Sequence, residues 1–364
     1  MSEWETVELG QIFTLKYGKA LKTADRNGGS IPVIGSSGIV GWHDSSIVDK
    51  PTLVVGRKGS IGSLTLTKGE SWPIDTAYYV DINLEKVDLK WLTYRLSGFN
   101  LKALNRAAAV PGLNRDDVYR LRTALPPLEQ QRHITSILDE ADAIRTNRRE
   151  QLGCLDELVR ALFFENFGNP LLNSRFKRLS IDKLAKVVTG NTPSRSQSSN
   201  YGEGIDWVKS DNLGAQYITN ADEQLTEIGK RKSRVAPTGS VLVCCIAGSR
   251  RSIGRASIAN KEVAFNQQIN AILPSAALDP IFLYSQLLVA PELVRRKSTG
   301  GMKGLVSKSA FASIEILVPP KHAQEAFSSK VAEIRAERDR VERALEADEE
   351  LFAALQHRAF RGEL

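Results

Sequence analysis

Residues 125–162 read LPPLEQQRHITSILDEADAIRTNRREQLGCLDELVRAL, and the same plan returns at the C-terminal end of the chain. Each stretch opens with two prolines, Pro126-Pro127 in the first and Pro319-Pro320 in the second. Proline has no backbone N–H and disfavours a helical residue before it, so a helix can begin only after each pair. No further proline interrupts either stretch, which predicts long helices over residues 129–166 and 322–360.

Apolar side chains recur along both predicted helices at alternating steps of three and four residues, the spacing of a single helix face. They are Ile134, Leu138, Ala141, Leu152, Leu155, Val159 and Leu162 in the first, and Phe327, Val331, Ile334, Val341, Leu345, Phe352 and Leu355 in the second. Arg145, Arg148 and Arg338 interrupt the stripes. Two singly striped helices in one chain favour an antiparallel coiled coil that buries both stripes. The alternative is that each helix packs only on its own domain.

The rest of the chain is also duplicated, and a repeat of this length decides the domain organisation. Matching segments occur in the same order in both copies: 7–12 with 179–184, Ile61-Gly62 with Ile253-Gly254, 91–94 with 281–284, 125–127 with 318–320, and 158–162 with 351–355. The offset between the copies drifts only from 172 to 193 residues, which one longer insertion in the second copy explains.

Each copy therefore consists of a globular part followed by a helix. The globular parts hold short β-rich runs, such as 52–55 and 240–243, between turns of Gly, Ser, Asn and Asp. The predicted fold class is α+β, with two similar mixed α/β domains separated by two long helices that form an antiparallel coiled coil. The predicted boundaries are 1–126 for the first domain, 127–168 for the first helix, 169–320 for the second domain and 321–364 for the second helix.

Charge follows the same division. The chain has a net charge of +7, with 16 basic against 13 acidic residues in 1–126 and 20 against 11 in 171–320. The helical segments are mildly acidic, at −3 for 127–170 and −2 for 321–364. Because duplex DNA is bound largely through its phosphates, the distribution favours DNA contact by the globular parts and leaves the helices for protein partners.

The sequence lacks the motifs of an enzyme. There is no Gly-x-x-x-x-Gly-Lys-Ser/Thr loop for ATP and no Asn/Asp-Pro-Pro-Tyr/Phe motif for a flipped adenine. The four histidines are scattered, and Cys154, Cys244 and Cys245 form neither a disulfide framework nor a metal spacing. No run of about 18 apolar residues predicts a membrane span, and the acidic start is unlike a secretory signal. We expect a cytoplasmic, non-catalytic chain without a cofactor or metal of its own.

Several local motifs resemble those of one protein family. They are IPVIGSSG (31–38), GWHD (41–44), VGRKGSIG (55–62) and WPIDT (72–76) in the first copy, TGNTPS (189–194) and IDWVK (205–209) in the second, and LPPLEQQR (125–132) at the start of the first helix. Together with the duplication, they resemble the specificity subunits of type I restriction-modification enzymes over nearly the whole chain. Asn191 departs from the usual Gly-Gly-Thr-Pro, and the second helix start, VPPKHAQ (318–324), is more diverged.

The resemblance implies that each globular part is a target-recognition domain for one half of an asymmetric, bipartite site in double-stranded DNA. Two methylation subunits, which bind S-adenosylmethionine, would dock on the helices, and restriction subunits would add ATP- and Mg-dependent translocation and cleavage. A helix of about 35 residues is roughly 50 Å long, about 15 base pairs of duplex, which suits two half-sites with a short gap. Since the two domains differ in sequence, the half-sites should differ as well.

Two basic turns are the leading candidates for DNA contact. Arg57, Lys58 and Ser60 lie in a glycine-bounded turn after an apolar run, and Arg250, Arg251 and Ser252 lie in the matching turn of the second copy. Arginine can bind guanine through two hydrogen bonds, and lysine or serine can bind phosphate. A plain solvated turn is the alternative interpretation.

Further candidates are distributed over both copies. Lys230 and Arg231, with Lys232 and Arg234 beside them, form a basic run, and Lys303 lies in a glycine-rich turn; phosphate contact is expected for them. Candidates for base edges are Ser36, His43, Lys209 and Asp211. Trp42 and Trp207 could border the DNA or belong to the core. The expected partner-binding surface is on the helices, around Ile134, Leu138, Leu152, Leu155, Val331, Ile334, Leu345 and Leu355.

Two other functions remain open from the residues alone. One is a coiled-coil adaptor that joins proteins and reads no DNA. The other is a single-chain nuclease or methyltransferase whose motifs are unrecognised.

Overall fold

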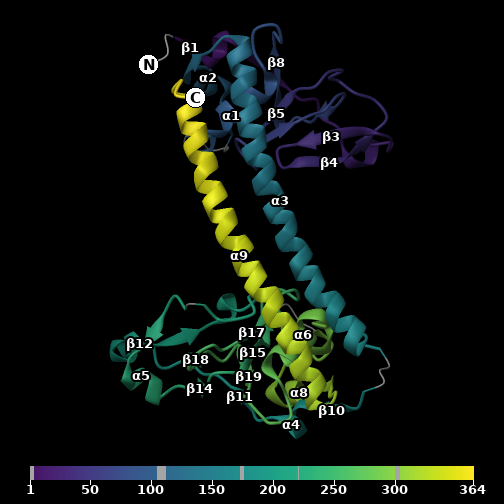
Figure 1. Cartoon of the computed structure of the whole chain (residues 1–364), viewed down its shortest axis with the longest axis vertical. Helices are drawn as coiled ribbons and strands as arrows, with labels where there is room; N and C mark the ends of the chain where they lie inside the picture. The colour runs from purple at the N-terminus through teal and green to yellow at the C-terminus, as the bar shows by residue number, and fades with distance from the viewer. Residues whose placement is uncertain (1–3, 105–111, 173–175, 220, 300–303) are drawn as a thin grey trace. The chain divides into compact units, whose positions relative to one another are not determined.

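The computed structural model describes residues 4–104, 112–172, 176–219, 221–299 and 304–364. The chain divides into two compact units, Met1–Arg149 with Arg343–Leu364, and Glu150–Glu342. Each unit combines one mixed α/β domain with part of both long helices, α3 (Leu128–Phe167) and α9 (Lys321–Ala359) (Figure 1). The two predicted helices and the mixed character of both domains are confirmed, and both helices begin directly after their proline pair.

The first domain is built from three small sheets. Its strands are β1 (Glu5–Glu8), β2 (Phe13–Tyr17), β3 (Ile31–Gly35), β4 (Gly38–His43), β5 (Leu53–Gly56), β6 (Leu64–Leu66), β7 (Trp72–Pro73), β8 (Ala77–Ile82) and β9 (Arg122–Leu125). Its helices are α1 (Leu89–Ser97) and α2 (Arg115–Tyr119), with short 3-10 turns at Leu9–Gln11, Thr23–Asp25 and Leu101–Leu104. The strand orders are β2-β8-β5-β6, β4-β3-β7 and β1-β9. All of β5 is buried, as expected for a central strand written as a continuous apolar run.

The second domain repeats this plan with additions. Its strands are β10 (Arg178–Ser180), β11 (Val187–Thr189), β12 (Tyr201–Val208), β13 (Gln224–Leu225), β14 (Val235–Ala236), β15 (Val241–Cys244), β16 (Ile246–Ala247), β17 (Ala256–Ile258), β18 (Val263–Phe265), β19 (Ile269–Ile272), β20 (Gly304–Leu305) and β21 (Glu315–Leu317). Its helices are α4 (Ile181–Leu184), α5 (Glu227–Arg231), α6 (Pro280–Val289), α7 (Glu292–Arg295) and α8 (Lys308–Ala312), with 3-10 turns at Ser198–Asn200 and Ser210–Asn212.

The sheets confirm the internal duplication. The order β11-β19-β15-β17 in the second domain corresponds to β2-β8-β5-β6 in the first, and both sheets are antiparallel throughout. In each domain the first strand also pairs with the strand that precedes the long helix, β1 with β9 and β10 with β21. Among the strands that the structure describes, the pair β16-β20 has no counterpart in the first domain.

An equivalent buried glutamine at the start of each long helix joins the helix to the domain before it. In α3, Gln131 donates to the carbonyls of Lys86 (3.0 Å) and Pro126 (2.8 Å) and accepts from the backbone N–H of Asp88 (2.8 Å). In α9, Gln324 does the same with Ala277 (3.1 Å), Pro319 (3.0 Å) and Asp279 (2.9 Å).

The hydroxyl four residues further along each helix completes this joint. Thr135 donates to the Asp88 carboxylate, and Ser328 donates to that of Asp279. The two joints are thus repeated group for group, which fixes each helix start by buried hydrogen bonds as well as by its prolines.

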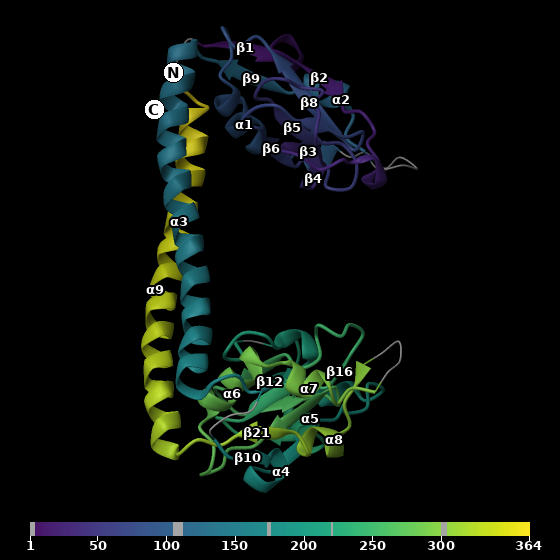
Figure 2. The same cartoon turned by 90° about the vertical axis from the view of Figure 1, so that its right-hand side faces the viewer.

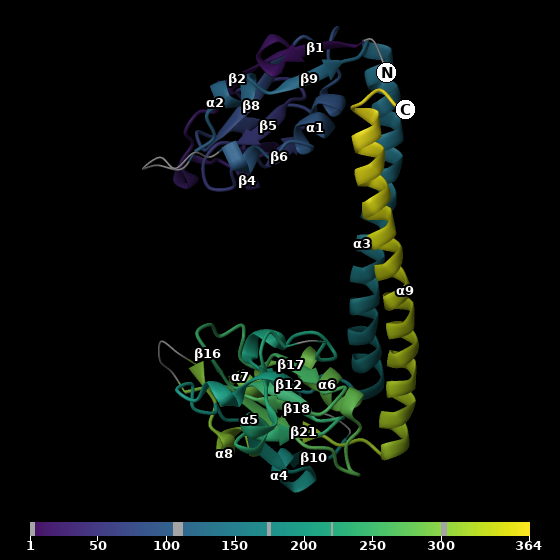
Figure 3. The ribbon, with the colours of Figure 1, turned by 90° about the vertical axis from the view of Figure 1, so that its left-hand side faces the viewer.

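The two helices pack against each other within each unit (Figures 2 and 3). In the first unit, the Arg145 guanidinium lies 3.4 Å from the centre of the Phe352 ring, and Arg148 Nε lies 3.3 Å from Asp348 Oδ2. In the second unit, Arg338 Nε lies 3.2 Å from Asp156 Oδ1. The partner position in α9 falls as the position in α3 rises, so the pairing is antiparallel. The arginines that interrupt the apolar stripes therefore join the helices.

Each helix also packs on the domain that the other helix follows. In the first unit, Gln356 of α9 donates to the carbonyl of Tyr94 (2.8 Å), and Phe352 is buried in the core of the first domain. In the second unit, Phe163 of α3 stacks on Phe282 of α6 with ring centres 5.7 Å apart. The alternative in which each helix packs only on its own domain is therefore wrong.

Candidate nucleic-acid interface

The leading candidate turn in the first domain follows the central strand β5. The N–H of Gly62 donates to the carbonyl of Gly56 (2.8 Å) and closes the turn. Gly62 has a φ of +76°, and a Cβ on Gly56 would lie 2.1 Å from the Ser60 carbonyl oxygen. Both positions therefore require glycine. This backbone presents Lys58 and Ser60 to solvent and leaves Arg57 half-buried.

Arg57 belongs to a surface group that we call the Tyr17 cluster, which consists of Tyr17, Arg57 and Arg115. The guanidinium of Arg57 lies 5.1 Å from the ring centre of Tyr17 and 5.8 Å from that of Tyr78. Arg115, from the start of α2, lies 5.5 Å from the same Tyr17 ring. Burial raises the pKa of Tyr78 to about 12, so this supporting ring stays neutral.

The Tyr17 cluster combines an exposed aromatic ring with two guanidinium groups, neither of which has an ion-pair partner among the described residues. Arginine stacked on an aromatic ring keeps its in-plane donors free for a phosphate or a guanine edge. Our sequence interpretation found Arg57 but missed Tyr17 and Arg115, because 40 and 58 residues separate them from Arg57 along the chain.

The two base-edge candidates of the first domain are placed less favourably. Ser36 is half-buried, and its carbonyl accepts the Ser63 hydroxyl beside the β5 turn. The ring of His43 is buried against Trp72, and its Nδ1 accepts the backbone N–H of Asn27 (3.2 Å). His43 therefore has a packing role in this structure, whereas Trp42 on the same strand is exposed.

The second domain carries the corresponding turn after β15. The N–H of Gly254 donates to the carbonyl of Cys244 (2.9 Å), as Gly62 does to Gly56, but this turn is four residues longer. Arg250 and Arg251 are exposed on it, and the Arg250 guanidinium lies at a long distance, 3.5 Å, from the Glu292 carboxylate. Ser252 is half-buried and its hydroxyl lies 3.2 Å from that of Ser249.

A second cation-aromatic cluster lies near the start of the second domain. The Arg195 guanidinium lies 4.4 Å from the ring centre of Tyr201 and 5.1 Å from that of Trp207, which is buried. Unlike the Tyr17 cluster, this one contains an acid: Glu223 pairs with Arg195 (2.7 Å) and with Lys209. Arg195 and Lys209 hold the pKa of Glu223 below its usual range. The predicted DNA contact of Lys209 thus has an internal competitor.

The remaining predicted contacts of the second domain are mostly exposed. Asp211 and Arg231 are exposed, and neither makes an ion pair within the described residues. Lys230 pairs with Glu262 at 2.5 Å, and Lys232 Nζ donates to the side chains of Gln197 and Asn200. Lys303 lies outside the described residues, so its prediction stays as it was.

The predicted partner-binding residues of the helices lie on their inner faces. Ile134, Leu138 and Val331 are buried, and the other five are half-buried: Leu152, Leu155, Ile334, Leu345 and Leu355. The large apolar residues that α3 and α9 expose are Ile144, Leu158, Phe164 and Leu351. These four fall outside the apolar stripes, which is the signal by which the sequence could have indicated an outer contact surface.

Comparison with known families tests this duplicated arrangement. The family described as type I restriction modification DNA specificity domain matches in two regions, residues 1–153 and 173–340. The chain belongs to this specificity-domain family. Each matched region begins in one domain and ends within the long helix that follows it, so the family model matches once in each copy of the repeat.

Named relatives agree with the assignment to the specificity-domain family. The type I restriction enzyme HindI specificity subunit of Haemophilus influenzae is 30% identical over 161 residues, which are 43% of this chain and 34% of that protein. The type I restriction enzyme EcoprrI specificity subunit of Escherichia coli is 28% identical over 120 residues, 33% of this chain and 30% of that protein. The matches thus span about a third of the length of these relatives.

A solved structure shares the fold over almost the whole chain. The S subunit of a type I restriction-modification system from M. genitalium superposes with a TM-score of 0.62, at 15% identity, and covers 98% of this chain and 96% of that one. At this identity the likeness shows a shared fold. Among the described helices, none is long and apolar enough to cross a membrane.

Proposed function

We propose that this chain is the DNA-reading subunit of a type I restriction-modification system. The observation that carries the proposal is the pair of basic turns, Gly56–Gly62 and Cys244–Gly254, which occupy corresponding places after the central strand of two related domains. Each domain reads one half of a bipartite site in duplex DNA. Because the two turns differ in length and sequence, the halves differ too.

Within the first domain, the Tyr17 cluster supplies the strongest contact. Two guanidinium groups on one exposed ring give a rigid set of donors for phosphate oxygens or for the O6 and N7 acceptors of guanine. Lys58 and Ser60 add exposed donors from the same turn. In the second domain Arg250 and Arg251 provide the corresponding charges on the longer turn.

The helices serve protein partners in this proposal. Ile144 and Leu351, with Leu158 and Phe164, are exposed apolar side chains on otherwise polar helix faces, which suits contact with protein. Two methylation subunits would dock there and bring S-adenosylmethionine, and restriction subunits would bring ATP and Mg. In this proposal the chain is the non-catalytic subunit and acts in the cytoplasm on genomic DNA.

The test is the salt dependence of DNA binding by the full chain. Fluorescence anisotropy with a random-sequence duplex reports the number of phosphate contacts as the slope of log K against log salt. The double variant Arg57→Gln, Arg115→Gln should bind more weakly and lower that slope by about two. Arg340→Gln, an exposed arginine on α9 paired with Glu337, is the matched control and should leave the slope unchanged.

Unchanged DNA binding by the Arg57→Gln, Arg115→Gln variant would show that this surface of the first domain does not contact DNA. If the Arg250→Gln, Arg251→Gln variant also binds DNA as the wild type does, the adaptor function is favoured instead. Methyl transfer or cleavage by the isolated chain would show that it is an enzyme.

A further inference from the structure

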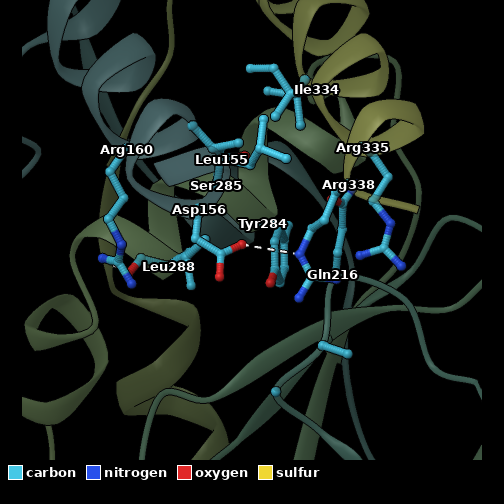
Figure 4. Close-up of a pocket in the computed structure, with 14 residues that line it drawn as sticks. Leu155, Asp156, Arg160, Gln216, Tyr284, Ser285, Leu288, Ile334, Arg335 and Arg338 are labelled. Atoms are coloured by element: carbon cyan, nitrogen blue, oxygen red, sulfur yellow. Dashed lines mark hydrogen bonds and ion pairs between the residues drawn. The ribbon is translucent and has the colours of Figure 1, made fainter. Parts of the chain in front are cut away.

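The second unit contains a cavity of about 210 Å³ beside its helix pair (Figure 4). The walls come from α3, α6, α9 and the segment 214–216. Six apolar side chains line it: Leu155, Val159, Ala215, Leu288, Val331 and Ile334. The polar lining consists of Asp156, Arg160, Gln216, Tyr284, Ser285, Arg335 and Arg338.

The first unit shows what fills the equivalent place there. Phe352 of α9 lies with its ring centre 5.9 Å from that of Tyr94, and the Arg145 guanidinium covers the Phe352 ring at 3.4 Å. The Tyr94 hydroxyl donates to the carboxylate of Asp139 (2.8 Å). This place is therefore occupied by an aromatic ring, with a carboxylate on the tyrosine hydroxyl.

The repeat keeps the walls of this place in the second unit but omits both occupants. Tyr284 corresponds to Tyr94 in the repeat. Arg338 corresponds to Arg145, because each lies at the same distance after the buried glutamine at the start of its helix. Position 352 corresponds to Val159, the second residue of the repeated segment 158–162, so the ring is absent. Ala332 corresponds to Asp139, because each lies eight residues after the buried glutamine at the start of its helix, so the carboxylate is absent as well.

Two hydroxyl groups that line the cavity, those of Tyr284 and Ser285, are available to donate to an acceptor. The Tyr284 hydroxyl makes no hydrogen bond with any residue that the structure describes, and Ser285 Oγ is buried without a partner. Burial raises the pKa of Tyr284 to about 12, so its hydroxyl stays protonated and able to donate.

The charge of the lining is positive. Arg160, Arg335 and Arg338 face one acid of the lining, Asp156, which pairs with Arg338. Arg335 uses its Nε on Asp339, and Arg338 uses Nη1 on Glu342, so each guanidinium has N–H donors left over. Among the described residues, Arg160 makes one long hydrogen bond of 3.4 Å, to the carbonyl of Leu288.

We propose that this cavity binds a small aromatic acid, with the ring in the place that Phe352 fills in the first unit. A carboxylate or phosphate on the ring would accept from Tyr284 and from the spare donors of the arginines, in the role that Asp139 has for Tyr94. Such a ligand would bind α3, α6 and α9 together and stabilise the second unit. The proposal does not depend on DNA reading by either domain.

The test uses benzoate and phenyl phosphate as probes of the full chain, with binding followed by calorimetry and by ligand-observed NMR. Both should bind saturably, and benzylamine, which has the ring but the opposite charge, should not. Val159→Phe restores the missing ring and should abolish binding while the protein stays folded. Arg338→Gln should weaken binding about tenfold or more, since it removes a charge-assisted donor. Arg340→Gln, outside the cavity, should bind as the wild type does.

Photo-crosslinking with 4-azidobenzoate locates the probe independently of any variant. Labelled peptides should contain residues 155–160, 214–216, 284–288 or 331–338. Labelling elsewhere, equal binding of benzylamine, full binding by folded Val159→Phe, or no saturable binding of either acid would overturn the proposal. A preference for one of the two probes would identify the acid group as carboxylate or phosphate.

Discussion

Replacing Gln324 by leucine removes three buried hydrogen bonds at the start of α9. The side chain is 1% exposed, and the change leaves the Asp279 N–H and the carbonyls of Ala277 and Pro319 without their partner. An unsatisfied buried polar group costs about 1–3 kcal/mol, so three cost at least about 3 kcal/mol even at the lower limit. Leucine is close in volume to glutamine, so packing contributes little to the change.

Hydrogen exchange followed by mass spectrometry measures this cost in each unit separately. Gln324→Leu should accelerate exchange of α6, within 280–289, by about a hundredfold, because each 1.4 kcal/mol is a factor of ten. The helix α1, within 89–97, should be unaffected. Gln131→Leu is the matched variant, since the same three bonds exist in the first unit, and it should give the reverse pattern.

The reasoning fails if either variant accelerates both helices equally, or if neither changes exchange by more than a few-fold. Equal acceleration would mean that the two units open together. A small effect would mean that the glutamines are not the groups that attach each helix to its domain.

Three further predictions follow from the interfaces and cores. Glu223→Gln should release Arg195 and Lys209, tighten binding to random duplex DNA and steepen the salt slope by about one; unchanged binding would show that this cluster does not meet DNA. Leu351→Lys should leave the melting temperature almost unchanged, because the side chain is exposed, but weaken capture of a co-expressed methylation subunit in a pull-down. In native protein one thiol should react quickly with Ellman's reagent, the exposed Cys154, whereas Cys245 should react only after unfolding, because burial raises its pKa to about 12; fast reaction of all three thiols would contradict the described core.

The duplication and both helices could be predicted because short stretches of the sequence specify them. Two proline pairs and an apolar stripe specify where α3 and α9 begin and which face is buried. The partners of those faces could not be predicted in the same way. The stripe of either helix suits a domain or another helix equally well, and only the fold shows that Gln356 bonds to Tyr94 and that Phe163 stacks on Phe282.

The candidate site divides along the same line. Arg57 and Arg250 could be found because glycine-bounded turns recur in both copies. The contribution of Tyr17 required the pairing of β2 with β8, which carries Tyr78 opposite Tyr17. The burial of His43 and the pairing of Lys209 with Glu223 likewise depend on residues that only the fold brings together, so the sequence around each residue does not predict them.

The central claim is that one chain reads two unlike half-sites, one with each domain. The most direct measurement is selection from a random duplex pool by the full chain purified with its methylation subunit, followed by sequencing of the bound DNA. The account predicts one enriched site with two different halves at a fixed spacing, and loss of preference in one half only for Arg57→Gln, Arg115→Gln. A palindromic site, a single uninterrupted site, or no enrichment at all would contradict it.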